Sequence, residues 1–298
     1  MFLFKKKDAE IKAHNANEQS TFTMGHNQFS CLTFEEFSSN YLGGLPPPEE
    51  EKAKTETEKQ SSEGDSDTSS SDESVSVVAT LSHPKVKIAQ VDWRDSDGVS
   101  EVRNQGKCGS CWAFGTTGVI ESARRIQLSI GGRLSEQQLV DCTFDRNGCD
   151  GGWTTSGLDY VIKHGGIQMN KHYRYRNEGK YKDCPKGNIG GPAKIANKTS
   201  SRNNDCTSLQ QLVKVRPAAV SVCVTHSFQN YKGGVFNGCK NNCNTDHIVL
   251  LYGYTSKGNW RIKNSWGKSW GNRGHMRIKS GNMCSICKYG GVNAYATA

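Results

Sequence analysis

The stretch between residues 46 and 82 most constrains how this chain can fold, because it contains almost no large apolar side chains. It begins PPPEEEKAKTETEKQSSEGDSDTSSSDES and is rich in Pro, Glu and Ser. Such a segment cannot bury enough apolar surface to offset the entropy lost on ordering. We therefore predict a disordered acidic linker over 46–88, between a small folded part, 1–45, and a globular part, 89–298.

The charges of the two ends differ in sign. Residues 1–88 carry 9 Lys+Arg and 15 Asp+Glu, net −6, whereas residues 89–298 carry 29 and 14, net +15. The linker is therefore expected to lie against the basic part, with a passive spacer and a generic basic surface as the alternatives. No apolar run approaches the roughly 20 residues of a membrane helix, and we expect neither a membrane nor nucleic acid as a partner.

Helical periodicity dominates the first half of the globular part and β-rich runs dominate the second. CWAFGTTGVIESARRIQL, 111–128, has helical spacing with Ser110 as its predicted cap, and LSEQQLVDC predicts a second helix starting near Ser135. AAVSVCV, HIVLLYGY, NWRIKNSW and HMRIK are short strands between Gly and Asn turns. The order predicts an α+β protein of two lobes, with a ligand site between them.

Cys111 opens the first predicted helix, after Gly109 and Ser110. The unpaired N–H groups and positive end of a helix N-terminus stabilise a thiolate and lower its pKa. A nucleophilic cysteine also needs a base, and the base needs an orienting group. Cys111 is therefore a candidate nucleophile.

Later motifs supply these partners. His247 starts an apolar strand 136 residues after Cys111, and Asn264 ends the next strand, 153 residues after it. An Asn carbonyl oxygen can hold an imidazole in one tautomer, and Trp266 would shield that bond from water. Gln105 could offer its amide N–H to a developing oxyanion, beside the backbone N–H of Cys111.

Two other uses of the CGSC pair compete with this interpretation. A zinc knuckle at Cys108 and Cys111 needs a second ligand pair, which Cys239 with Cys243, or Cys284 with Cys287, would provide. A redox pair needs a βαβ context, which the sequence does not indicate. Both leave the His and Asn motifs unused, so we expect no metal and no cofactor.

The motifs QGKCGSCWAF, CDGGW, LSEQQLVDC, TDHIVLLYGY and RIKNSWGKSWGNRGHMRIK, in this order, resemble the papain-like cysteine proteases, most of all the cathepsin L type. The resemblance implies a papain-like two-lobe fold, with a helical left lobe and a β-barrel-like right lobe, after a small helical propeptide. It implies a cysteine endopeptidase made as a zymogen, with Cys111 as nucleophile, His247 as base and acid, Asn264 orienting His247, and Gln105 as oxyanion donor.

The resemblance also implies three disulfides: Cys108–Cys149, Cys142–Cys184 and Cys239–Cys284. Four further cysteines, Cys206, Cys223, Cys243 and Cys287, are extra to this pattern. For these we predict Cys243–Cys287, and with less support Cys206–Cys223, although sequence alone does not settle the pairing. Twelve cysteines favour an oxidising compartment.

The front of the chain resembles part of the family's inhibitory propeptide. Phe4, Ile11 and Asn15 fit its helix motif, but Lys7 replaces an Asn there. Gly25, Asn27 and Phe29 fit a second propeptide motif, in which Cys31 replaces the usual Asp. The first half of the helix motif and a secretory signal are not seen, so we expect the natural protein to begin further upstream. Residues 46–88 would then hold the cleavage region.

Substrate contacts are implied by position in the family. The S2 pocket would be lined by Trp153, Thr154, Ser221, Ile248 and Tyr289, and further substrate contacts would come from Gly151, Gly152 and Trp266. Ile248 is bulky where relatives have Gly or Ala, which predicts a shallow S2 that prefers small or medium apolar P2 residues over Phe. Gly115 also departs from the family, which commonly has Ser there.

The resemblance implies protein or peptide substrates, the chain's own propeptide and cystatin-type inhibitors as partners, a monomer, and a lysosomal or extracellular location. Two rival interpretations remain. A catalytically silent relative retained for binding or inhibition would have lost Cys111, His247, Asn264 or Gln105, and all four are present. A truncated product that does not fold would lack the help of a complete propeptide.

Overall fold

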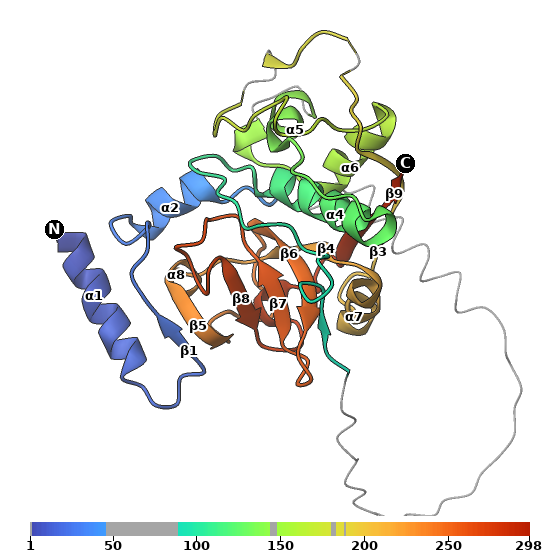
Figure 1. Ribbon diagram of the computed structural model, residues 1–298. Helices are drawn as coiled ribbons and strands as arrows, with labels where there is room; N and C mark the ends of the chain where they lie inside the picture. The colour runs from blue at the N-terminus through green and yellow to red at the C-terminus, as the bar shows by residue number, and fades with distance from the viewer. Residues whose placement is uncertain (1, 46–88, 144–147, 180–182, 188) are drawn as a thin grey trace, which may run out of the picture.

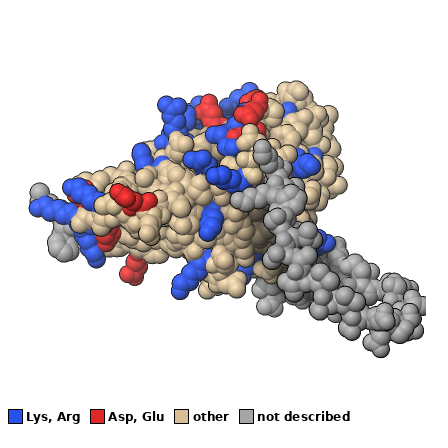
Figure 2. Space-filling model, turned by 90° about the horizontal axis from the view of Figure 1, so that it is seen from below, with Lys and Arg blue, Asp and Glu red and all other residues tan. Residues whose placement is uncertain are grey.

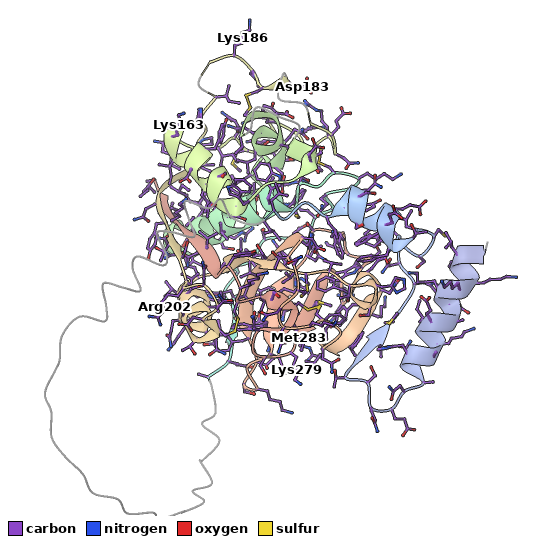
Figure 3. All side chains as sticks on the ribbon, turned by 180° about the vertical axis from the view of Figure 1, so that it is seen from behind. Lys163, Asp183, Lys186, Arg202, Lys279 and Met283 are labelled. Atoms are coloured by element: carbon purple, nitrogen blue, oxygen red, sulfur yellow. A yellow bond between two sulfur atoms is a disulfide. The ribbon has the colours of Figure 1, made fainter. Side chains whose placement is uncertain are left out.

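The computed structural model describes residues 2–45, 89–143, 148–179, 183–187 and 189–298. The predicted linker, 46–88, lies outside these ranges. The described residues form a helical lobe and a β-rich lobe (Figure 1). Seen from behind, Lys163 marks the helical lobe, and Lys279 and Met283 mark the β-rich lobe (Figure 3). The predicted α+β architecture is confirmed. No helix within the described ranges is long and apolar enough to cross a bilayer.

The helical lobe is built around one buried helix. Residues 111–124 of α4 are all buried, because the helix is covered by the other helices and by the ends of the sheet. The lobe contains α4 (Cys111–Leu128), α5 (Glu136–Cys142), the 3-10 turn η1 (Gly148–Asp150) and α6 (Thr154–Lys163). Most of these buried side chains are small or apolar, and the buried carboxylate of Glu121 is paired with Arg103.

The caps of the two predicted helices differ. Ser135 precedes α5 as predicted, and its hydroxyl accepts the N–H of Gln138 at 3.0 Å. Ser110 precedes α4, but its side chain makes no capping hydrogen bond and lies 2.7 Å from the Tyr175 hydroxyl. The predicted side-chain cap of α4 is therefore wrong, and it is the Ser110 carbonyl that accepts the Ala113 N–H, at 2.8 Å.

The β-rich lobe contains one mixed sheet with the described strand order β1-β5-β8-β7-β6-β4-β9-β3, and β2 pairs with β6. Its strands are β1 (Phe22–Met24), β2 (Val91–Asp92), β3 (Lys194–Ser200), β4 (Ala218–Val222), β5 (Tyr231–Phe236), β6 (His247–Tyr254), β7 (Trp260–Lys263), β8 (His275–Ile278) and β9 (Gly291–Thr297). Three short helical elements flank it: α7 (Cys206–Val215), α8 (His226–Gln229) and η3 (Met283–Ser285).

Strand β6 is the centre of this lobe. All eight of its residues are buried, because β4 and β7 pair with its two edges. β7 runs antiparallel to β6, with Leu250 opposite Lys263. The chain that follows β7 therefore runs past the start of β6, and there the Asn264 side chain reaches the His247 imidazole.

The front part of the chain packs against the β-rich lobe (Figure 1). It contains α1 (Phe2–Asn15), β1 and α2 (Phe34–Tyr41). β1 adds an antiparallel strand to β5, and the Asn15 amide exchanges two hydrogen bonds of 2.9 Å with the backbone of Met24, which joins α1 to β1. Thr33 and Glu36 form a capping box at the start of α2.

Two aromatic side chains anchor the front part. Phe29 and Phe37 are fully buried, with ring centroids 4.9 Å apart. Both meet the Trp266 ring edge to face, at 5.5 and 5.1 Å. Aromatic pairs of this geometry contribute about 0.5–1.5 kcal/mol each beyond the area they bury.

Basic side chains outnumber acidic ones on the face seen from below, where they are spread over the surface (Figure 2). This agrees with the net charge of residues 89–298. The expected contact with the acidic linker concerns residues outside the described ranges and stays a prediction.

Five disulfides join ten of the twelve cysteines. The three implied by the family resemblance are present: Cys108–Cys149, Cys142–Cys184 and Cys239–Cys284. The two guesses for the extra cysteines are wrong, since the structure pairs Cys206 with Cys287 and Cys223 with Cys243. Cys206 begins α7, and its Cα lies 5.2 Å from that of Cys287. Cys243 and Cys287 each lie close in the sequence to one half of the Cys239–Cys284 disulfide, but they are not bonded to each other.

Peptide mapping of the non-reduced, alkylated protein tests this pairing. We expect linked peptides containing Cys206–Cys287 and Cys223–Cys243, with the exposed free Cys31 alkylated. Replacing both Cys206 and Cys287 by Ser should lower the free energy of unfolding by about 2–4 kcal/mol. A peptide linking Cys243 to Cys287 would contradict the structure.

Candidate active site

Cys111 is the first residue of α4 and is fully buried. The loop before it is held by the Cys108–Cys149 disulfide and by a 2.8 Å hydrogen bond from the Gly109 N–H to the Cys149 carbonyl. The backbone N–H groups of Trp112 and Ile248 are directed at the thiol and favour its ionised form. The thiol therefore lies at a helix N-terminus and beside the residue that follows His247.

His247 and Asn264 form a buried hydrogen bond beneath Trp266. The Nε2 atom of His247 lies 2.8 Å from Oδ1 of Asn264, and the Trp266 ring stacks on the imidazole at a centroid distance of 4.5 Å. All three side chains are at most 2% exposed. Oδ1 only accepts, so Nε2 carries the proton. Nδ1 has no hydrogen-bond partner among the described residues and is left as the basic nitrogen.

Ser265 links Asn264 to Gln105. Its backbone N–H donates to Oδ1 of Asn264 at 2.8 Å, and its hydroxyl donates to Oε1 of Gln105 at 2.5 Å. Its carbonyl accepts the Gln105 backbone N–H at 2.8 Å. Because Ser265 occupies the oxygen of the Gln105 amide, the NH₂ group of Gln105 is turned toward the cleft. Sequence reasoning missed Ser265, although its position inside the NSW motif was a signal.

A buried cluster of charges supports the end of β7. Arg103 forms ion pairs with Glu121 of α4, at 2.5 Å, and with Glu136 of α5. Lys263 donates to the carbonyl and the hydroxyl of Ser100 at 3.0 and 2.9 Å, and burial lowers the pKa of Lys263 to about 8. The cluster fixes the residue that immediately precedes Asn264. Periodicity does not reveal this cluster, because a single buried charge looks like a surface charge in a sequence.

Residues 43–45 of the front part cross the cleft over these groups. Gly43 and Gly44 both donate to the Asp246 carbonyl, at 3.0 and 2.8 Å, and the Gly152 N–H donates to the Gly43 carbonyl at 2.9 Å. A Cβ atom on Gly43 would lie 2.0 Å from the Gly109 carbonyl oxygen, and one on Gly44 would lie 2.7 Å from the backbone nitrogen of His247. Only glycine allows this approach.

The same segment occupies the Gln105 amide. Nε2 of Gln105 donates to the Tyr41 carbonyl and to the Cys108 carbonyl, each at 2.9 Å. The Tyr41 carbonyl oxygen, from the front part, thus accepts the hydrogen bond that Gln105 is predicted to donate to an oxyanion. Sequence reasoning did not identify Tyr41, because the contact is made by its backbone.

Burial under this segment suppresses ionisation at the site. It raises the pKa of the Cys111 thiol to about 12, against the opposing effect of the nearby N–H groups. It lowers the pKa of His247 to about 4, with the bond to Asn264 acting in the other direction. In this state thiol and imidazole are both neutral at neutral pH.

The predicted S2 residues come from several elements. Ser221 of β4 is directly opposite Ile248 of β6, and Thr154 begins α6, with Trp153 immediately before it. Gly152 opposes Gly44, and a Cβ on Gly151 would lie 3.2 Å from Cγ of Leu45. Tyr289 lies after η3, where its ring is 5.4 Å from the Lys288 ammonium. The structure places Ile248 and Thr154 beside Gly115, and Ser221 opposite Ile248, whereas the role of Tyr289 stays a prediction.

The zinc-knuckle alternative does not fit this site. Cys108 is bonded to Cys149, and Cys239 and Cys284 are bonded to each other. Disulfide sulfurs are not thiolate ligands. Within the described ranges no group of three or more His, Cys, Asp or Glu side chains is placed to hold a metal ion.

Comparisons with known proteins match both parts of the chain. Residues 88–293 match the family described as papain family cysteine protease, and residues 2–37 match the cathepsin propeptide inhibitor domain. "Cathepsin L 1" of Paramecium tetraurelia is 34% identical over 92% of this chain and 78% of its own length. "Cathepsin L-like proteinase" of Fasciola hepatica is 34% identical over 95% of this chain and 83% of its own length.

Solved structures give the same result. Digestive procathepsin L2 from the Tenebrio molitor larval midgut superposes with a TM-score of 0.80 and 31% identity, covering 98% of this chain and 91% of that one. A recombinant stem bromelain precursor superposes with a TM-score of 0.79 and 29% identity, covering 98% and 89%. Both structures are of precursor proteins.

Gly43→Ala tests whether residues 43–45 bury the thiol. The new methyl group would collide with the Gly109 backbone, so we expect the segment to leave the cleft. Alkylation of Cys111 at neutral pH should then become faster by roughly tenfold or more, which corresponds to about 1.4 kcal/mol. Cys111 modification would be followed by peptide mass spectrometry.

Gly25→Ala is the matched control, because its Cβ would meet only the flexible Lys232 side chain, at 3.3 Å. It should leave the alkylation rate of Cys111 unchanged. Equal rates for Gly43→Ala and the parent protein would contradict the proposed burial.

Proposed function

Because the chain belongs to the papain family of cysteine proteases, we propose that Cys111 is its nucleophile and His247 the general base and acid. Asn264 orients His247, and Gln105 with the Cys111 backbone N–H binds the oxyanion. The observation that carries these assignments is the His247–Asn264 bond under Trp266, which leaves Nδ1 of His247 as the basic nitrogen. Together these groups supply nucleophile, base and orienting residue.

The reaction runs in two steps. Once the cleft is open, the Cys111 proton passes to Nδ1 of His247, and the thiolate forms a bond to the scissile carbonyl carbon. The carbonyl electrons move to the oxygen, where Gln105 Nε2 and the Cys111 N–H stabilise the negative charge. The C–N bond then breaks as His247 gives its proton to the leaving amine, and a thioester remains.

Water completes the cycle. His247, now neutral, takes a proton from a water molecule as the oxygen attacks the thioester carbonyl. The second tetrahedral intermediate uses the same oxyanion donors. The C–S bond breaks with its electrons going to sulfur, the carboxylic acid product leaves, and the Cys111 thiolate is regenerated beside the His247 imidazolium that holds the proton taken from water. Ser265 keeps both amides in the required orientation throughout.

The front part acts as an inhibitor of this site. Residues 1–45 are the propeptide, 46–88 hold the cleavage region, and 89–298 are the mature enzyme. Support comes from the match of residues 2–37 to a propeptide inhibitor domain and from the Tyr41 carbonyl on Gln105. While residues 1–45 are docked, the Tyr41 carbonyl accepts the Gln105 N–H that we assign to the oxyanion, so a substrate carbonyl is denied this hydrogen bond.

The substrates are proteins or peptides, cut as by an endopeptidase, with small or medium apolar residues preferred at P2. Substrate would replace residues 43–45 along Gly151 and Gly152. The five disulfides support folding in an oxidising compartment, and we place the enzyme in lysosomes or outside the cell. Cystatin-type inhibitors would use the same cleft, and the enzyme would act as a monomer.

A catalytically silent relative is less well supported. All four reacting or binding groups are present, and hydrogen bonds join His247 to Asn264, and Asn264 through Ser265 to Gln105. Peptide hydrolysis by the matured chain separates the two possibilities. We expect Cys111→Ala to abolish hydrolysis, and Gln105→Ala to lower kcat by roughly 10²–10³-fold, the usual effect of losing one oxyanion donor.

Ser265→Ala should lower kcat by roughly tenfold with little change in KM, because it loosens two amides without removing either. A matured, folded parent protein that hydrolyses no peptide and reacts with no thiol-directed epoxide would contradict the assignment and favour the silent relative.

Release of the propeptide should depend on pH through His226. Its Nε2 is within hydrogen-bonding range of the Lys7 ammonium, and Glu10 of α1 lies 3.6 Å away. The side chains that face it are Lys6, Lys7 and Glu10 of α1 and Phe34 of α2. Burial, and then Lys7, lower the pKa of His226 in the docked state.

On release the pKa of His226 returns toward about 6.5. The released domain therefore binds the proton more tightly, and docking weakens as the pH falls below about 6.5. We expect His226→Gln, which keeps an acceptor for Lys7, to move the midpoint of acid-induced release to lower pH. Release would be followed in Cys111→Ala protein, which does not process itself, by size-exclusion after cleavage within residues 46–88.

His172→Gln, at an exposed position in the helical lobe, is the matched control and should leave the midpoint unchanged. Equal midpoints for His226→Gln and the parent would show that His226 does not contribute.

A further inference from the structure

Two departures from the family pattern meet in space. Gly115 stands where relatives commonly have Ser, and Ile248 stands where they have Gly or Ala. Gly115 lies four residues after Cys111, on the same face of α4, and Ile248 follows His247 on β6. The two positions are 133 residues apart in the sequence, so the sequence alone does not connect them.

The space above Gly115 is filled by Ile248. A Cβ atom on Gly115 would lie 2.7 Å from Cγ2 of Ile248, 3.0 Å from Oγ1 of Thr154 and 3.4 Å from Cβ of Ala219. Ile248 is 4% exposed. Its Cγ2 methyl group therefore sits in a notch that exists only because residue 115 has no side chain.

A glycine in the interior of a helix needs a reason, because it lowers helix stability relative to alanine. Gly115 has no positive φ, so no unusual backbone conformation requires it. The steric contact with Ile248 is the requirement that the structure provides.

We propose that Gly115, which does not itself touch substrate, determines the P2 preference of the enzyme by receiving the Cγ2 methyl group of Ile248. This rests on the proposed function and deepens it. With Gly115 the β-branched side chain is drawn toward α4, and the S2 pocket keeps room for a medium apolar residue. Any side chain at 115 would push Ile248 toward the cleft and close S2.

The Thr154 hydroxyl points to the same coupling. Oγ1 of Thr154 is buried and has no hydrogen-bond partner within the described part of the chain. A serine hydroxyl at position 115 is placed to reach it once Ile248 is shortened. Serine at 115 with alanine at 248 is therefore a compatible pair, whereas serine with isoleucine is not.

The test is a double-mutant cycle of Gly115→Ser and Ile248→Ala on the matured enzyme, with kcat/KM measured for matched peptides bearing Ala, Val, Leu or Phe at P2. We expect Gly115→Ser to lower the Leu-to-Ala ratio by roughly tenfold, the discrimination produced by about one methylene of lost space. Ile248→Ala should raise the Phe-to-Ala ratio by a similar factor. The double variant should keep that raised ratio and recover the thermal stability lost in Gly115→Ser.

Gly118→Ala is the matched control on the same helix. Its Cβ would lie 3.3 Å from Cδ1 of Leu250 and would not meet Ile248. It should leave all P2 ratios unchanged, so that a general disturbance of α4 is separated from an effect on S2.

The proposal is overturned if Gly115→Ser lowers kcat/KM equally for all P2 residues, or if the effects of the two substitutions on the P2 ratios are independent. If Gly115→Ser does not fold, Ile248→Ala alone still decides, because an unchanged Phe-to-Ala ratio in that variant excludes Ile248 as the wall of S2. Absence of hydrolysis and of epoxide labelling in the parent would instead contradict the proposed function, not this coupling.

Discussion

The buried hydrogen bond between His247 and Asn264, covered by the Trp266 ring, is the interaction on which the rest of this structure depends. It joins the start of β6 to the residue after β7, so the sheet register and the imidazole orientation support each other. In a region of low dielectric such a bond is stronger than in water, and an unpaired group there would be costly. The proposed base is thus part of the core of the β-rich lobe.

The propeptide packs on the same ring. Phe29 and Phe37 meet Trp266 edge to face, while His247 stacks on it. Gly43 and Gly44 then bring the backbone over the thiol, and the Tyr41 carbonyl takes the Gln105 amide. The inhibition that we propose therefore uses the same side chains as the proposed catalysis, because burial under the front part keeps thiol and imidazole neutral.

Much of this arrangement could be predicted from the sequence. The helix that begins at Cys111 and the strands that place His247 and Asn264 follow from apolar periodicity, because each is a long or central element with a strong pattern. The pairing of Cys206 with Cys287 and of Cys223 with Cys243 could not, because it depends on which loops meet after folding. Contacts made by backbone, such as the Tyr41 carbonyl, leave no residue-type signal at all.

The coupling of Gly115 with Ile248 could not be predicted from the sequence either, because it depends on a contact between distant residues. Each departure was visible in the sequence, but only the fold shows that one makes room for the other. Buried charges behave similarly: Arg103, Glu121 and Glu136 resemble surface residues in a sequence window, yet the fold buries and pairs them, so that losing one partner would leave an uncompensated buried charge.

The most direct test of this account is the pH profile of Cys111 alkylation, measured in the intact precursor and after removal of the propeptide. The account predicts almost no reaction in the precursor between about pH 5 and 8, since burial holds the pKa of Cys111 near 12 and that of His247 near 4. It predicts rapid reaction over the same range once the cleft is open and the thiolate–imidazolium pair forms. Equal profiles for the two forms would mean that the propeptide does not suppress ionisation, and would contradict the account.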